Sequence, residues 1–235
     1  CTHNTNPAGD WLFNFKGGFA HGGYAYFSPR RRFSAYHTVV RVDATNFPPP
    51  PPVSTAAEFN GTTVLDVKKR LGNCDTCKGF SGAFTDGTYG YLVPENTQGS
   101  NHGNAVRFLL SNYCDNTQRT QASPPSCASL TDPTVENVDL GAINANMVGF
   151  TAGFTDGTYG YYTPNSATIM ARIDLSDWTA SGVTQLYLTG YLKEADGTTN
   201  FPASNPGATA GFQGKGFALG GYGYVRGLPR RLPHS

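Results

Sequence analysis

Charge is scarce in this chain of 235 residues, where Asp, Glu, Lys and Arg together make up 14% and the formal net charge is +1. So small and balanced a charge gives no electrostatic case for binding nucleic acid or an anionic membrane surface. No apolar run approaches the roughly 18–20 residues that a membrane-spanning helix needs. The sequence also lacks windows of strong helix formers with helical periodicity, which argues against long helices. We therefore expect no nucleic-acid partner and no membrane span.

Glycine and aromatic residues are abundant instead, with 29 Gly, 15 Phe and 13 Tyr. Gly disfavours helices and aromatic residues favour strands, so the composition predicts an all-β protein. The chain opens at Cys1 without a recognisable leader, which indicates a removed leader or a segment of a longer product. Residues 225–235 form a tail rich in Pro and Arg.

One pattern rich in aromatic residues and glycine occurs four times, beginning near residues 15, 79, 149 and 211. The copies at 79–94 and 149–164 share the run Phe-Thr-Asp-Gly-Thr-Tyr-Gly-Tyr, and the outer two are looser. A repeated Phe and two tyrosines suit an aromatic core between units better than exposed binding residues, because packing is needed in every copy. These predicted core residues are Phe19, Tyr24 and Tyr26; Phe84, Tyr89 and Tyr91; Phe154, Tyr159 and Tyr161; and Phe217, Tyr222 and Tyr224.

Each copy is typical of a β-hairpin. Asp86-Gly87 and Asp156-Gly157 are expected to form two-residue type I′ turns, which need positive φ at both central positions. Strict alternation would put Phe80 and Phe84 on one face of the first strand. Gly90, between two tyrosines, would face the other side and allow another sheet to approach closely.

Two further strands follow the hairpin in the first three copies. The third strands, at 39–43, 105–109 and 170–175, each carry an arginine, and the fourth are expected at 64–67, 135–140 and 183–188. The predicted fold is a single β-repeat domain over residues 1–235, built from tandem four-stranded antiparallel units that resemble propeller blades. The fourth copy stops after its hairpin, so we expect the units not to close within one chain and to leave strand edges for a neighbour.

The five cysteines favour an oxidising compartment. Cys74 and Cys77 form a C-x-x-C, and Cys114 and Cys127 bracket a loop, so both pairs are candidate local disulfides. Zinc would require further ligands at similar spacing. Cys1 is left as a free thiol, a partner for a missing segment, or a bond to a neighbouring subunit. Asn60, in Asn-Gly-Thr, is a candidate N-glycosylation site.

The hairpin motif, with its Thr-Asp-Gly-Thr turn and an Arg on the next strand, resembles a repeat of secreted tandem-repeat proteins from algae and other aquatic protists. Some extracellular protist proteins with β-repeats belong to cell-surface coats and flagellar hairs, so the resemblance implies a surface or filament role and supplies no catalytic residues. In algal secreted proteins, proline runs of this kind resemble sites of hydroxylation and O-glycosylation. The candidates here are Pro48, Pro49, Pro50, Pro51 and Pro52, with Ser54 and Thr55. A plain polyproline II spacer or docking element is the equal alternative.

The polar residues favour structural roles over chemistry. Asp86 and Asp156 recur at equivalent turn positions, where turn formation explains both without invoking a glycosidase pair. Asp43, Asp66, Asp139 and Asp174 lie at strand ends without a calcium-loop pattern, and the histidines lack metal spacing. Arg41, Arg107 and Arg172 are expected to pair with a repeated Asp or to stack on Tyr.

We therefore predict a non-enzymatic extracellular structural protein without a cofactor. It would carry covalent glycans and assemble with copies of itself into a filament or surface layer. The alternative is a propeller-like lectin whose exposed tyrosines stack on sugars.

Overall fold

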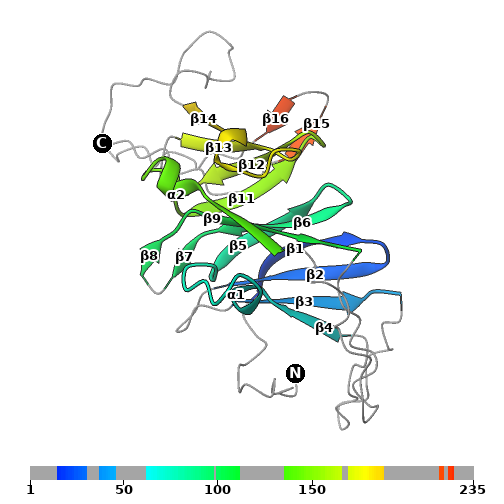
Figure 1. Ribbon diagram of the computed structural model, residues 1–235. Coiled ribbons are helices and arrows are strands. Elements are labelled where there is room, and N and C mark those ends of the chain that lie inside the picture. The colour runs from blue at the N-terminus through cyan, green and yellow to red at the C-terminus, as the bar shows by residue number, and fades with distance from the viewer. Residues whose placement is uncertain are drawn as a thin grey trace, which may run out of the picture.

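The computed structural model describes residues 15–30, 37–45, 62–97, 99–111, 135–165, 169–187, 217–219 and 222–224. In these residues the fold is all-β, and each of the first three repeat units forms one four-stranded antiparallel sheet (Figure 1). The fourth unit contributes a two-stranded hairpin. The predicted tandem organisation is therefore confirmed. Several predicted sites lie outside the described residues: Cys1, Cys114, Cys127, Asn60, Pro48–Pro52, Ser54, Thr55 and the tail at 225–235.

The three sheets are meanders, in which strands adjacent in the chain pair with each other. Sheet 1 contains β1 (Phe15–His21), β2 (Tyr24–Pro29), β3 (Thr38–Asp43) and β4 (Thr62–Asp66), followed by the short helix α1 (Val67–Arg70). Sheet 2 contains β5 (Phe80–Thr85), β6 (Tyr89–Pro94), β9 (Asn104–Leu109) and β10 (Val135–Asp139), followed by α2 (Leu140–Ile143). A small hairpin of β7 (Asn96–Thr97) and β8 (Ser100–Asn101) is inserted after β6.

Sheet 3 contains β11 (Phe150–Thr155), β12 (Tyr159–Pro164), β13 (Ile169–Asp174) and β14 (Val183–Tyr187), with a 3-10 turn at Ala180–Gly182 before β14. The fourth hairpin consists of β15 (Phe217–Leu219) and β16 (Tyr222–Tyr224). The first strands of the four units, β1, β5, β11 and β15, lie side by side in chain order, so the units form a stack (Figure 1).

A β-bulge near the start of each of the first three units changes which residues share a face. Phe80 pairs with Pro94 and Gly82 with Val93, so Ser81 is an extra residue on β5. One extra residue reverses the face of every side chain beyond it. The prediction that Phe80 and Phe84 share a face is therefore wrong. Phe80 belongs to the core between sheets 1 and 2, whereas Phe84 belongs to the core between sheets 2 and 3.

The predicted type I′ turns at Asp86-Gly87 and Asp156-Gly157 are also wrong. The last pair between β5 and β6 is Thr85 with Gly90, and three residues, 86–88, connect the two strands. Gly87 has φ of 93°, but Asn73 is the one non-glycine with positive φ among the described residues, so Asp86 does not adopt the type I′ conformation. In the first unit His21 pairs directly with Tyr24, and the two-residue loop is Gly22-Gly23, with φ of 56° and 81°.

Hydrogen bonds from side chains, not a type I′ backbone conformation, stabilise the loop between β5 and β6. The Asp86 Oδ1 atom accepts hydrogen bonds from the backbone N–H groups of Thr88 (2.8 Å) and Tyr89 (2.7 Å). The Thr85 hydroxyl donates to the carbonyl of Tyr89 and accepts from the N–H of Gly87. The same bonds recur around Asp156 in sheet 3. The repeated Thr-Asp-Gly-Thr run is therefore an Asx turn closed by a threonine.

The sheets pack through an aromatic side chain that enters a gap left by glycine. A Cβ added at Gly90 of sheet 2 would lie 2.6 Å from the Phe19 ring of sheet 1 and 2.5 Å from the Phe108 ring. Added at Gly153 of sheet 3, it would lie 2.6 Å from the Phe84 ring of sheet 2. We call these small-residue positions the glycine notch: Gly90 on sheet 2, and Gly153 with Gly160 on sheet 3. The close approach expected at Gly90 is confirmed.

The notch predicts unequal effects on stability when one methyl group is added at Gly90 or removed at the equivalent Ala25. Gly90→Ala should lower the free energy of unfolding by about 1–3 kcal/mol, because the Cβ enters space held by two rings. Ala25 occupies the same repeat position on sheet 1 and already has a Cβ, so Ala25→Gly should change stability by at most about 1 kcal/mol. Denaturant unfolding of both variants at low protein concentration measures the difference. Equal losses would contradict the notch.

Candidate functional site

Asp86 and Asp156, for which the sequence favours a turn role over a catalytic pair, both form hydrogen bonds within their own hairpins. The Tyr91 hydroxyl donates to Asp86 Oδ2 at 2.7 Å, and the Tyr161 hydroxyl donates to Asp156 Oδ2 at 2.8 Å. Burial and the neighbouring carboxylate raise the pKa of Tyr91 above its ordinary value. Partial burial alone would raise the pKa of Asp156, but hydrogen bonds from the Tyr159 and Thr158 amides and the Tyr161 hydroxyl lower it. Asp156 is thus a hydrogen-bonded carboxylate, unsuited to act as a general acid near neutral pH.

The strand-end aspartates cap local structure. Asp66 and Asp139 accept hydrogen bonds from the first-turn amides of α1 and α2 and so serve as N-caps. Asp43 and Asp174 each accept from the backbone and side chain of the residue two positions on, Thr45 and Ser176. In the part of the chain that the structure describes, no three His, Cys, Asp or Glu side chains gather as a metal site would require.

The repeated arginines stack on tyrosines, one of the two arrangements predicted for them. The guanidinium carbon lies 4.3 Å from the ring centre in Arg41–Tyr24, 4.4 Å in Arg107–Tyr89 and 4.4 Å in Arg172–Tyr159. Arg107 also donates to the carbonyl of Leu175 at 3.1 Å and forms an ion pair with Glu136, so it links sheets 2 and 3. These ring faces are engaged by a cation of the same chain.

The predicted Cys74–Cys77 disulfide is present, with an S–S distance of 2.09 Å. It closes the short connection between α1 and β5, and Cys77 is buried in the core between sheets 1 and 2. Within the described residues, no helix is long and apolar enough to cross a membrane.

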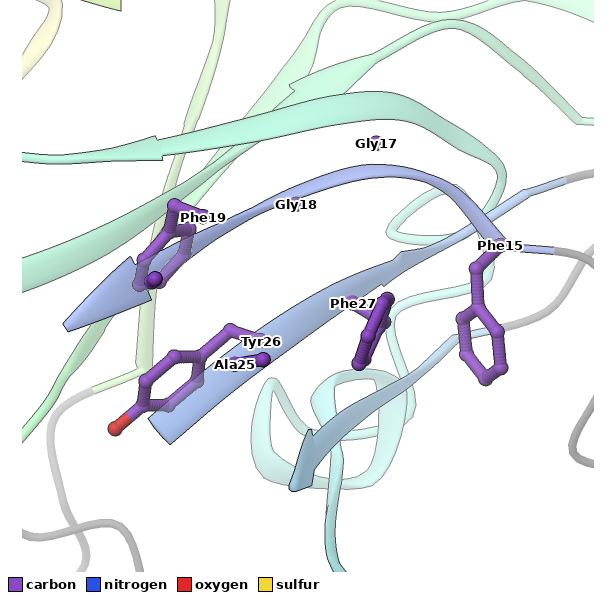
Figure 2. A pocket seen from close by; sticks show the side chains of 8 residues that line it. Phe15, Gly17, Gly18, Phe19, Ala25, Tyr26 and Phe27 are labelled. Atoms are coloured by element: carbon purple, nitrogen blue, oxygen red, sulfur yellow. The ribbon is translucent and has the colours of Figure 1, made fainter. Parts of the chain in front are cut away.

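An apolar groove of about 610 Å³ lies along the first hairpin (Figure 2). Phe15 and Phe27 stand at one end of it and Phe19 and Tyr26 at the other, and Gly17 and Gly18 separate Phe15 from Phe19 along β1 (Figure 2). The rings of Phe15 and Phe27 are in contact, with centres 5.8 Å apart. The described lining residues, none of them charged, are Phe15, Gly17, Gly18, Phe19, Ala20, Ala25, Tyr26 and Phe27.

Four of the residues that line the groove lie on the face of sheet 1 that points away from sheet 2, whereas Phe19 and Tyr26 lie on the face toward sheet 2. Phe19 and Tyr26 pack toward sheet 2, where their rings lie 6.3 Å and 6.2 Å from Phe108. Gly18 pairs with Phe27, and Ala20 with Ala25, in register with Phe19–Tyr26. Successive side chains of a strand alternate between faces, so these four residues lie on the opposite face.

The groove repeats, position by position, the surfaces that are covered inside the stack. Phe27 corresponds to Leu92 on sheet 2 and to Tyr162 on sheet 3, and both of those are 0% exposed. Phe15 corresponds to Phe80 and Phe150, which are also 0% exposed. Phe15 and Phe27 keep part of their surface exposed, and Gly18 and Ala20 are exposed. Sheet 1 thus presents the face that an adjacent sheet covers elsewhere.

The groove was not predicted, although the sequence holds a signal for it. Once the bulge is known, Gly18, Ala25 and Phe27 fall in register with Ala83, Gly90 and Leu92 of the second unit. This alignment can be recognised only when the face of each residue is known. Strict alternation would place Phe15 on the face of Phe19, whereas the bulge places it on the face of Gly18.

No protein-family model matches this chain, and a comparison with curated proteins finds no match either. The resemblance to secreted protist repeat proteins therefore stays a prediction.

His102 is a buried histidine that the sequence did not single out. It is 5% exposed, its Nε2 lies 3.2 Å from the carbonyl oxygen of Gly79, and its ring meets Phe80 edge-on at 5.8 Å. Its backbone carbonyl accepts from the N–H of Gly149, so it lies between units 2 and 3. Burial lowers the pKa of His102, against opposing effects of the Gly79 carbonyl and the Asp139 charge.

This lowered pKa predicts a loss of stability in mild acid. The unfolded chain takes up a proton below about pH 6.5, whereas folded His102 does so only at lower pH, so stability is full above that pH and falls below it. The slope contributed by one proton is at most about 1.4 kcal/mol per pH unit. Denaturant unfolding between pH 7.5 and 5 should show a flatter profile for His102→Gln. The exposed His21→Gln is the control and should keep the wild-type slope; equal slopes for both variants and wild type would remove His102 as the cause.

Proposed function

We propose that this protein is a non-enzymatic extracellular structural protein whose repeat units assemble into a filament or surface layer. The observation that carries the proposal is the groove on sheet 1, which presents a partly exposed counterpart of the surface that joins the sheets inside the chain. Exposed apolar surface of this kind marks interaction sites on soluble proteins.

The turn residues support a structural role over catalysis. Asp86 and Asp156 close hairpin loops, and the hydroxyls of Tyr91 and Tyr161 are engaged with them. The Thr85 and Thr155 hydroxyls bond within the same loops. The chemistry-bearing groups of the repeat are therefore occupied in holding its shape.

The lectin alternative gains little from the described tyrosines. A sugar-binding tyrosine must offer a ring face. Tyr24, Tyr89 and Tyr159 have an arginine over one face, and Tyr91 is 0% exposed. Packing accounts for the repeated tyrosines better than ligand binding.

An extracellular location is part of the proposal. The Cys74–Cys77 disulfide fits an oxidising compartment, since structural disulfides are uncommon where thiols are kept reduced. The resemblance to secreted protist repeat proteins supports the same location, as do the candidate glycosylation sites.

Electron microscopy of the native material tests the structural role directly. We expect filaments or sheets that label with an antibody against this chain on the cell surface, because the groove and the repeat step favour end-to-end assembly. Dispersed single particles in native extracts at every concentration would contradict the proposal.

Mass spectrometry of the secreted chain tests the glycoprotein prediction. Peptides that contain Asn60 should carry an N-glycan released by glycosidase, and the peptide with Pro48–Pro52, Ser54 and Thr55 should gain hydroxyl and sugar masses. The peptide 149–164, which lacks an Asn-X-Ser/Thr sequon and a proline run, serves as the control. Unmodified peptides from native protein would overturn this part.

A further inference from the structure

One Phe–Tyr pair occupies the same register in all four hairpins, and we call it the aromatic pair. The paired residues are Phe19 with Tyr26, Phe84 with Tyr91, Phe154 with Tyr161, and Phe217 with Tyr224. In the first three hairpins the two rings are stacked, with centres 4.7, 5.0 and 5.0 Å apart and planes within 16° of parallel. The fourth hairpin carries the same residue types at the same register.

Between described sheets the phenylalanine of the aromatic pair enters the notch of the next unit along the chain. Phe19 of sheet 1 meets Gly90 of sheet 2, and Phe84 of sheet 2 meets Gly153 and Gly160 of sheet 3. The contact has a direction, because the pair lies on one face of each sheet and the notch on the other. A stack built this way has a notch at its first end and an aromatic pair at its last.

The groove of sheet 1 lies at the position of the notch, at the first end of the stack, and its small residues are Gly18 and Ala25, whose methyl group has no counterpart at Gly90 or Gly160. Gly18 and Ala25 stand where sheet 3 has Gly153 and Gly160, and the Phe27 ring stands where sheet 3 has Tyr162. Phe84 meets Tyr162 edge-on with ring centres 5.6 Å apart. Uncharged lining and small residues beside an aromatic ring are what an incoming phenylalanine finds inside the stack.

The fourth hairpin stands at the opposite end. Its strand β15 lies against β11 of sheet 3, on the side of the molecule opposite sheet 1 (Figure 1). The first strand of the hairpin is thus the neighbour of β11, as β11 is the neighbour of β5 and β5 of β1, and the groove lies at the other end of this order.

We propose that the groove of sheet 1 binds the fourth hairpin of a second copy of this chain, with Phe217 entering between Gly18, Ala25 and Phe27. This inference rests on the proposed structural role and identifies the contact between copies in the assembly. The two surfaces differ, so the contact is head-to-tail and does not close on two copies, which produces a linear polymer. The contact is made by sheet faces, in contrast to the strand edges that the incomplete fourth repeat had led us to expect.

Two variants each remove one half of the contact. Ala20→Arg places a charge in the groove at an exposed position, so folding should be retained. Phe217→Asp removes the entering ring. Each change should weaken self-association by at least about tenfold, since loss of a central aromatic anchor typically costs more than 1.4 kcal/mol. Tyr187→Arg places the same charge on a residue that is 52% exposed on β14 and should assemble like wild type.

Mixing the two variants separates the specific contact from a general effect. Each variant alone should be monomeric in analytical ultracentrifugation at concentrations where wild type polymerises. An equimolar mixture should form dimers and no larger species, because one intact groove and one intact hairpin remain. Phe217→Leu, which keeps an apolar side chain, guards against a folding defect and should restore partial polymerisation.

Polymerisation of either variant to the wild-type extent would overturn the inference while leaving the structural role in place. A mixture that stays monomeric would overturn it too, since the two halves would then not be partners. Wild-type chain that stays monomeric at every concentration would assign the groove to another occupant, such as an upstream repeat of a longer chain. In that case electron microscopy of the native material still decides the structural role.

Discussion

The packing of a phenylalanine ring against glycine on the neighbouring sheet is the interaction on which the rest of the structure depends. Four-stranded sheets of this size bury too little apolar surface alone, so each unit must be covered by the next. A Cβ at Gly90 or Gly153 would overlap the incoming ring, which means that the distance between sheets is set by the absence of a side chain. Burial of each ring contributes on the order of 2 kcal/mol, so the stack is stabilised one interface at a time.

Because this interaction has a direction, the repeat also has a polarity. Each described sheet has a phenylalanine ring on one face and a surface of small residues on the other. Polar contacts also join neighbouring units. Lys16 pairs with Glu95 between units 1 and 2, and the Ser81 hydroxyl donates to the carbonyl of Phe150 between units 2 and 3. Because the interface is directional, the two ends of the stack have different surfaces. If these surfaces are complementary, the same contact can form between two molecules. This is the physical basis for reading the groove as an assembly surface.

Hydrogen bonding inside the loops explains why so many polar residues of the repeat carry no chemistry. Thr85 and Asp86 bond to the backbone of the loop, and Tyr91 donates to Asp86; sheet 3 repeats these bonds. The first unit has no such aspartate and uses Gly22-Gly23 with positive φ at both residues. Two turn solutions thus serve the same hairpin register, and the outer repeat could diverge in sequence because glycine supplied the conformation directly.

Much of the fold could be read from the sequence, because the period of the repeat, the hairpins and the Arg-bearing third strands are local patterns that survive in any packing. The local Cys74–Cys77 disulfide and the close approach at Gly90 were also foreseeable, since each follows from neighbours in sequence or from a missing Cβ. What the sequence could not decide was the face on which each residue lies. One bulge residue, Ser81, sends Phe80 and Phe84 to different cores, and a bulge is set by how two neighbouring strands of a sheet pair. The candidate site depends on that decision, because Phe15, Gly18, Ala25 and Phe27 form one apolar surface only in the folded unit. The tertiary structure places their counterparts in units 2 and 3 against a neighbouring sheet and leaves these four residues partly or fully exposed.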